Sequence, residues 1–203
     1  MTYVTVGGRD AQRILHNARL FAAEDDLRPV LMGVRLVVAD RVWAIGANPF
    51  ALGWDSAETA DGDGAFALTL PREVVDFTLR ELKTYGKKLI DEVSVVISDQ
   101  SIVIGAAVLT YKPVEGDYPD YRQVIPGGAG EATPNIAIAP WMVGMIEKVR
   151  SDTPVSRWTF RGPIRPIEVE IGETFKAVLM PLRAPDTRAV SAPPIGVSKP
   201  VAA

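Results

Sequence analysis

The same order of predicted elements occurs three times along this 203-residue chain, at a spacing of roughly 65 residues. Each unit consists of a strand, a helix and three further strands. Repetition at a fixed period is typical of modular proteins, in which neighbouring units complete each other's sheets and core. We therefore expect an α+β fold built from three similar units.

The repeat follows from the apolar periodicity: strands are predicted where β-branched residues alternate with others, and helices where apolar residues recur every three or four positions. The first unit is predicted to contain a strand at 3–6, a helix at 9–23 and strands at 34–38, 42–45 and 50–54. In the second unit the corresponding ranges are 66–70, 72–85, 93–98, 101–104 and 108–111. In the third unit they are 135–138, a helix from 140, and strands at 156–160, 167–171 and 175–180.

Residues 115–126 separate the second unit from the third. Acidic residues, prolines and a glycine break regular structure there. Tyr118, Tyr121 and Val124, however, are too apolar for a free linker. We therefore expect this connector to be pinned against the folded units on either side.

The polar faces of the predicted helices are rich in basic residues. At 100° per residue, the second helix gathers its charges within about 80°, and the three faces carry Arg9, Arg13 and His16, then Arg72, Asp76, Arg80, Lys83 and Lys87, then Lys148 and Arg150. One interpretation is a solvated helix surface. The other is contact with phosphates, which requires Lys and Arg on one surface but no particular nucleotide sequence.

Composition argues against an enzyme and against a membrane protein. The chain has a net charge of −3, no cysteine and one histidine, His16, which we expect to be solvated. We find no phosphate-loop motif, and the Asp61-Gly-Asp-Gly64 stretch lacks the remaining ligands of a calcium loop. No signal peptide or membrane span is recognisable, so a soluble, cytoplasmic protein without catalysis, metal or cofactor is expected.

Three stretches, residues 117–126 (DYPDYRQVIP), 178–183 (VLMPLR) and 27–33 (LRPVLMG), together resemble the bacterial DNA polymerase III beta sliding clamp family. Residues 117–126 (DYPDYRQVIP) are similar to the connector between domains of that family, and residues 178–183 (VLMPLR) to its C-terminal strand. Residues 27–33 (LRPVLMG) are similar to the segment between its first helix and the next strand. The resemblance implies the DNA-clamp fold, with helices on one face of antiparallel sheets.

The resemblance also implies how the chain is divided. Residues 1–126 correspond to a complete two-unit domain with its connector, and residues 127–183 to half of a further domain. Residues 184–203 lack apolar periodicity and are expected to be a disordered tail. Two departures from the family pattern stand out: residues 47–52 replace a usual Thr-Asp-Gly-His-Arg-Leu, and the loop at 24–26 is more acidic.

The implied function is that of a polymerase processivity factor, a homo-oligomeric ring in the nucleoid that binds double-stranded DNA and captures peptides of a DNA polymerase. If the ring needs twelve units, four chains would supply them. The predicted DNA-binding residues are Arg9, Arg13, Arg72, Arg80, Lys83, Lys87 and Lys148. The predicted peptide-binding residues are Leu31, Pro49, Phe50, Leu52, Pro126, Val178, Leu179, Met180, Pro181, Leu182 and Arg183. The alternative is an adaptor or decoy that forms no ring but still binds clamp-binding peptides.

Overall fold

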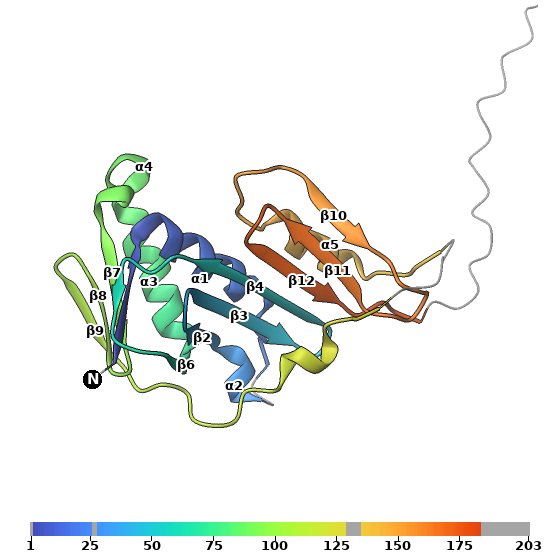
Figure 1. The fold of residues 1–203 in the computed structure, drawn as a ribbon, viewed down its shortest axis with the longest axis horizontal. Helices are drawn as coiled ribbons and strands as arrows, with labels where there is room; N and C mark the ends of the chain where they lie inside the picture. The colour runs from blue at the N-terminus through green and yellow to red at the C-terminus, as the bar shows by residue number, and fades with distance from the viewer. Residues whose placement is uncertain (1, 26–27, 129–134, 184–203) are drawn as a thin grey trace, which may run out of the picture.

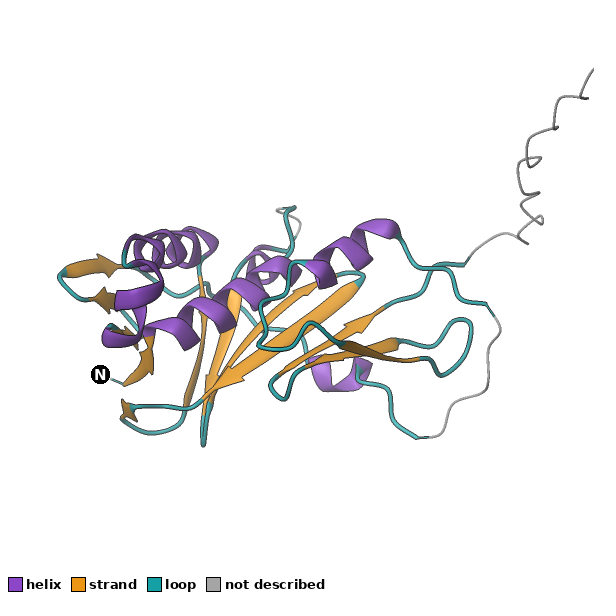
Figure 2. Cartoon of the chain, turned by 90° about the horizontal axis from the view of Figure 1, so that it is seen from above, coloured by secondary structure: helices purple, strands orange, loops and turns teal. Residues whose placement is uncertain are grey.

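Two antiparallel sheets with helices packed against them make up the protein (Figures 1 and 2). The computed structural model describes residues 2–25, 28–128 and 135–183. The predicted tail at 184–203 lies outside the described residues. The α+β class predicted from the sequence is confirmed, and the three units follow the predicted order except that the third lacks its first strand within the described residues.

The elements follow the predicted order. The first unit contains β1 (Tyr3–Gly7), α1 (Gly8–Phe21), α2 (Pro29–Met32), β2 (Val34–Val38), β3 (Val42–Asn48), β4 (Ala51–Ala57) and the short β5 (Asp61–Gly62). The second contains β6 (Phe66–Leu70), α3 (Arg72–Thr84), α4 (Gly86–Leu89), η1 (Ile90–Glu92), β7 (Ser94–Ser98), β8 (Ser101–Ile104) and β9 (Ala107–Thr110). After the connector helix η2 (Tyr121–Val124), the third contains α5 (Pro140–Glu147), β10 (Ser156–Thr159), β11 (Ile167–Ile171) and β12 (Phe175–Leu179).

The first two units exchange their first strands. β1 pairs with β7, the strand after the second unit's helix, and β6 pairs with β2, the strand after the first unit's helix region. Alternate residues of β1 and β6, such as Val4 and Leu70, are consequently buried in one core that both units share. Neither unit could bury this apolar surface without the other, which explains why the repeat comes as a pair.

The third unit extends the sheet of the first. β12 pairs with β4, so that the order of the seven-stranded sheet is β10-β11-β12-β4-β3-β2-β6. Side chains alternate across this sheet: Ala51 and Leu179 face a core with Phe21 of α1 and Met142 of α5. α1 and α5 therefore cover the same face of the sheet.

The connector lies against the opposite face. Figure 1 shows it running from β9 past α2 toward the third unit. Tyr118 and Tyr121 pack against Leu52 of β4 and Val178 of β12. The connector is therefore pinned against the folded units, as its apolar residues predicted.

Two glycines let α1 approach the sheet closely. A Cβ atom at Gly46 of β3 would lie 1.8 Å from the carbonyl oxygen of Ala18, and one at Gly53 of β4 would lie 2.4 Å from the ring of Phe21. These contacts fix α1 directly over β3 and β4. The helix face that carries Arg13 and His16 is thereby set beside the third unit.

Three sequence predictions need correction. The second helix, predicted at 72–85, ends at Thr84. Gly86 adopts a left-handed conformation (φ 64°) that interrupts the helix, so Lys87 does not continue its basic face as predicted. Residues 135–138 form a single bridge, between Ala137 and Leu182, instead of a strand. The loop between α1 and β2 contains the unpredicted helix α2. The division into a domain at 1–126 and a half-domain at 127–183 stays a prediction.

Candidate functional site

An apolar groove of about 210 Å³ lies on the face of the seven-stranded sheet opposite α1 and α5. Its walls come from α2, from the turn between β3 and β4, from the end of β12 and from the connector. Six of the residues predicted to bind a peptide line it: Leu31, Pro49, Phe50, Leu52, Val178 and Met180. Stretches more than a hundred residues apart in sequence thus meet at one surface.

The other five predicted residues do not line this groove. Leu179 is fully buried and faces the core under α5, because it alternates with Val178 and Met180 along β12. Leu182 pairs with Ala137 in the bridge described above. The remaining three, Pro126, Pro181 and Arg183, are likewise absent from the groove's walls.

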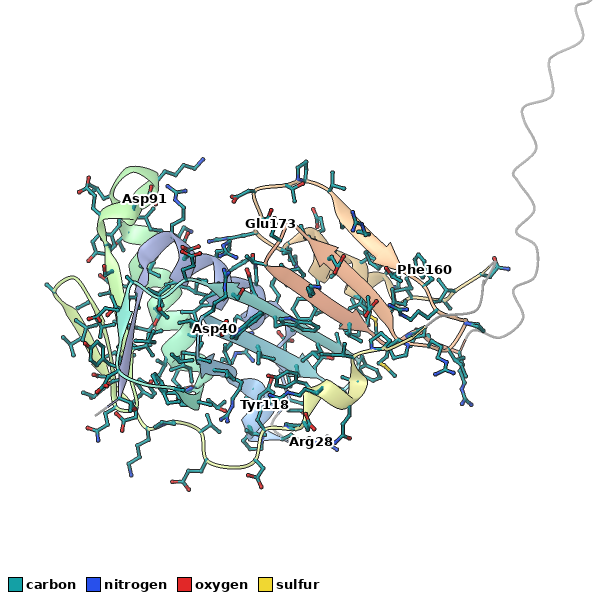
Figure 3. The ribbon with its side chains drawn as sticks, in the orientation of Figure 1. Arg28, Asp40, Asp91, Tyr118, Phe160 and Glu173 are labelled. Atoms are coloured by element: carbon teal, nitrogen blue, oxygen red, sulfur yellow. The ribbon has the colours of Figure 1, made fainter. Side chains whose placement is uncertain are left out.

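The connector contributes more of the groove than the sequence predicted. Its lining residues are Pro119, Asp120, Tyr121 and Val124. Asp120 caps η2 by accepting a hydrogen bond from the backbone N–H of Arg122 at 3.2 Å. Arg28, just before α2, places a cation at the rim on the same side as Tyr118 (Figure 3). The aromatic residues of the connector were the available sequence signal for this wall.

Asn48 stabilises the β3–β4 turn, which forms one wall of the groove. The turn belongs to residues 47–52, the stretch that departs from the family pattern. The Oδ1 atom of Asn48 accepts hydrogen bonds from the backbone N–H groups of Phe50 (2.9 Å) and Ala51 (3.0 Å), and its Nδ2 donates to the carbonyl of Phe21 at 3.1 Å. The Phe50 side chain is 50% exposed and meets Trp141 of α5 edge to face, at 6.2 Å between ring centroids. An aromatic residue therefore stands at the mouth of the groove.

Tyr118 of the connector packs among apolar side chains. Its ring packs with Ile45, Leu52 and Val178. Burial raises the pKa of the Tyr118 phenol, and its buried hydroxyl has no hydrogen-bond partner among the described residues. The ring thus supports the groove through packing alone.

Two of the seven predicted DNA-binding residues, Arg9 and Arg13, form close ion pairs within the protein. The Arg13 guanidinium donates to Asp55 at 2.5 Å, to Asp10 at 2.8 Å and to the Thr174 hydroxyl at 2.9 Å. Arg9 forms a two-pronged ion pair with Asp91, at 2.5 and 2.6 Å, at the α4 end of the molecule (Figure 3). Their positive charge is already balanced, so they contribute little to a free basic surface.

The other five basic side chains differ in their exposure and in whether they form ion pairs within the protein. Arg80, Lys83 and Lys148 are exposed and form no ion pair within the described ranges. Arg72 lies 3.9 Å from both Glu24 and Asp76, a loose contact. Lys87 is exposed but follows the break at Gly86, off the continuous face of α3. The assignment of all seven residues to DNA binding stays a prediction.

His16 is partly buried rather than fully solvated, which corrects the sequence-based expectation. The imidazole lies within hydrogen-bonding distance of the Lys148 carbonyl, with Nε2 at 3.1 Å. Burial between α1 and the end of α5 lowers the pKa of His16. The sequence could not reveal this, because the two residues lie 132 positions apart.

The described part of the chain offers no catalytic metal centre. It contains no group of three or more His, Cys, Asp or Glu side chains that could hold a metal ion. Asp61 instead pairs with β1 and accepts a hydrogen bond from the Tyr3 hydroxyl at 3.0 Å. Among the described helices, none is long and apolar enough to cross a membrane.

Comparison with solved structures identifies the arrangement as the sliding-clamp fold. The DNA polymerase III subunit beta of Pseudomonas aeruginosa matches with a TM-score of 0.74 and 15% identity, over 90% of this chain and 67% of that chain. The sliding clamp of Bacillus subtilis gives 0.71 and 14%, over 90% and 64%. The clamp of Caulobacter crescentus gives 0.70 and 18%, over 90% and 65%.

The resemblance seen in the sequence is therefore confirmed at the level of the fold. This chain spans about two thirds of the length of the matched clamps (64–67%). No family model and no curated protein matches the sequence. At such low identity, the shared architecture alone does not fix the activity.

Proposed function

We propose that this chain is a sliding-clamp-like processivity factor. It lies along or encircles double-stranded DNA without reading its sequence, and it captures short polymerase peptides in the apolar groove. The groove carries the proposal: Leu31, Phe50 and Met180 converge on one hollow although they come from three separate stretches. Peptide recognition typically depends on a few anchors buried in such a hollow.

The DNA contact is proposed for the opposite, helical side. Arg80, Lys83 and Lys148 are exposed there, and Lys and Arg on one surface attract phosphates regardless of base sequence. Such contacts permit sliding. No chemistry is assigned to the chain, and we expect it to act by holding partners together rather than by catalysis.

One observation favours the adaptor as a second candidate. Arg9 and Arg13 form ion pairs with Asp91 and Asp55. Fewer unpaired basic side chains are therefore available to contact DNA than the sequence predicted. An adaptor would need the groove but not the basic helices. It would bind clamp-binding peptides and show no association with DNA.

Calorimetric titration with a clamp-binding peptide tests the groove. Met180→Asp should weaken binding at least about tenfold, because it places a charge in the apolar hollow. Leu182→Asp is the matched control: Leu182 is similarly exposed but lies outside the groove, so binding should persist. Failure of the wild type to bind would refute both candidates.

DNA titration then separates the processivity factor from the adaptor. The processivity factor should bind duplexes of any sequence with similar affinity, and its binding should weaken as salt is added. A chain that binds the peptide but no DNA at low salt would be the adaptor.

A further inference from the structure

The third unit keeps a backbone edge open that the first two units close by pairing with each other. In those units, the strand that follows the helix receives the first strand of the other unit, as β7 receives β1 and β2 receives β6. The corresponding strand of the third unit is β10. It is the outermost strand of the seven-stranded sheet, and its outer edge has no partner strand in the described part of the chain.

One backbone hydrogen bond recurs in all three units and shows which residues of their first segments correspond. The carbonyls of Thr5, Thr69 and Ala137 each accept a hydrogen bond from a backbone N–H that follows the last long strand of the same unit, at 2.8, 2.9 and 2.8 Å. Each of these residues lies three positions before the first residue of its helix. Residues 136–138 therefore occupy the place of β1 and β6, but no sister unit pairs with them in the described part of the chain.

The side chains of this segment are incompletely covered. The positions on either side of the aligned carbonyl are buried in the first two units, where they hold Val4, Val6, Leu68 and Leu70. In the third unit the same positions hold Ile136 and Ile138, which are only partly buried. A partner unit would complete their burial.

The helices repeat the pattern. The same alignment places Val143 of α5 with Ala11 of α1 and Val75 of α3. α1 and α3 pack against each other, and both Ala11 and Val75 are 0% exposed. Val143 is 47% exposed. An apolar position that is covered by a sister helix in units one and two is thus uncovered in unit three.

We propose that the third unit pairs with the third unit of a second copy of this chain, in the arrangement that units one and two adopt. Residues 135–138 of each copy pair with β10 of the other, and α5 packs against α5. A two-fold contact of this kind closes both open edges at once. The structure itself argues for this occupant, because the equivalent edges of β2 and β7 are covered by units of the same kind.

The contact should be weaker than the one inside the chain. Glu147 stands where α1 and α3 carry Leu15 and Leu79, so less apolar surface is available. We therefore expect a reversible dimer whose population rises with protein concentration. The inference does not rest on the proposed function, because the pairing requires neither DNA nor peptide.

A head-to-tail contact is the competing arrangement. There the edge of β10 would meet β9, the edge strand of the five-stranded sheet, in the next copy. That contact would leave Val143, Ile136 and Ile138 without further cover. The two arrangements therefore predict different effects of changes at Val143 and at Val108, an exposed residue of β9.

Sedimentation equilibrium of the full chain, without DNA or peptide, tests the pairing over about a hundredfold range of concentration. The wild type should form dimers, and Val143→Asp should weaken dimerisation at least about tenfold by placing a charge at the contact. Val108→Asp is the matched control and should leave the dimer intact. Both valines are well exposed in one chain, 47% and 62%, so thermal melts should show that neither change unfolds the protein.

Three results would overturn the inference: a wild type that stays monomeric throughout, a dimer that survives Val143→Asp, or a dimer that is lost in Val108→Asp. A monomer that still binds DNA and peptide would overturn this pairing and leave the proposed function standing. A dimer that binds neither DNA nor peptide would refute the proposed function and leave this pairing standing.

Discussion

Replacing Asp55 with Ala should destabilise the protein and loosen the third unit. Asp55 lies in β4 with its side chain 0% exposed. Its carboxylate accepts hydrogen bonds from Arg13 (2.5 Å), Asn17 (2.7 Å) and the backbone N–H of Ser56 (2.7 Å). Loss of the carboxylate would leave a partly buried cation and a buried amide without their main acceptor.

The expected loss of stability depends on which hydrogen bonds Arg13 and Asn17 retain without the Asp55 carboxylate. Breaking a buried ion pair by removing one member typically costs about 3–5 kcal/mol. Arg13 retains Asp10 and the Thr174 hydroxyl, and Asn17 retains the carbonyl of Arg150. We therefore expect the lower end of the range, about 3 kcal/mol, against a typical total stability of about 5–15 kcal/mol.

Asp10→Ala is the matched control, because Asp10 accepts from the same guanidinium at 2.8 Å but is 50% exposed. Exposed ion pairs contribute about 0–1 kcal/mol. Urea unfolding followed by fluorescence of the four tryptophans would measure both changes. Equal costs for the two variants, or a cost below about 1 kcal/mol for Asp55→Ala, would refute the reasoning.

The same cluster joins α1 to the third unit. Arg13 reaches Thr174, which precedes β12, and Asn17 reaches the backbone of Arg150, which follows α5. Because one wall of the groove comes from β12, Asp55→Ala should also weaken peptide binding without touching the groove. Unchanged peptide affinity in a folded Asp55→Ala protein would show that the third unit is held by its core contacts alone.

Three further predictions test the site. Tyr118→Phe should leave stability unchanged or raise it by up to about 1 kcal/mol in thermal or urea unfolding, because the phenol has no hydrogen-bond partner among the described residues; a clear loss would reveal one. The pKa of His16 is lowered by burial, so its contribution to stability is complete above its unfolded pKa of about 6.5 and is lost as the pH falls through the folded value. His16→Gln should remove that part of the pH dependence, and an unchanged stability–pH profile would contradict the lowered pKa of the partly buried imidazole. Arg80→Ala with Lys83→Ala should reduce the log–log salt slope of DNA binding by roughly 0.9 per residue if each contacts a phosphate, and an unchanged slope would mean a merely solvated face.

The sequence alone determined the α+β class, the order of the units and most element boundaries. It could do so because apolar periodicity and the Gly and Pro breaks are local properties, set by residues a few positions apart. The connector shows how far such signals extend: its tyrosines predicted that it is pinned. The motifs at 27–33, 117–126 and 178–183 then pointed to the sliding-clamp fold, which the comparison of structures confirmed.

The tertiary structure decided which polar groups are free and which side of a strand is used. Arg13 was predicted to be a surface cation, yet it is bound to Asp55, 42 positions away, and His16 is partly buried beside the end of α5. Met180 lines the groove, whereas Leu182 lies in the bridge to Ala137 and does not line it. Such outcomes depend on which elements meet in space, and residues so far apart in sequence share no local pattern from which their contact could be inferred.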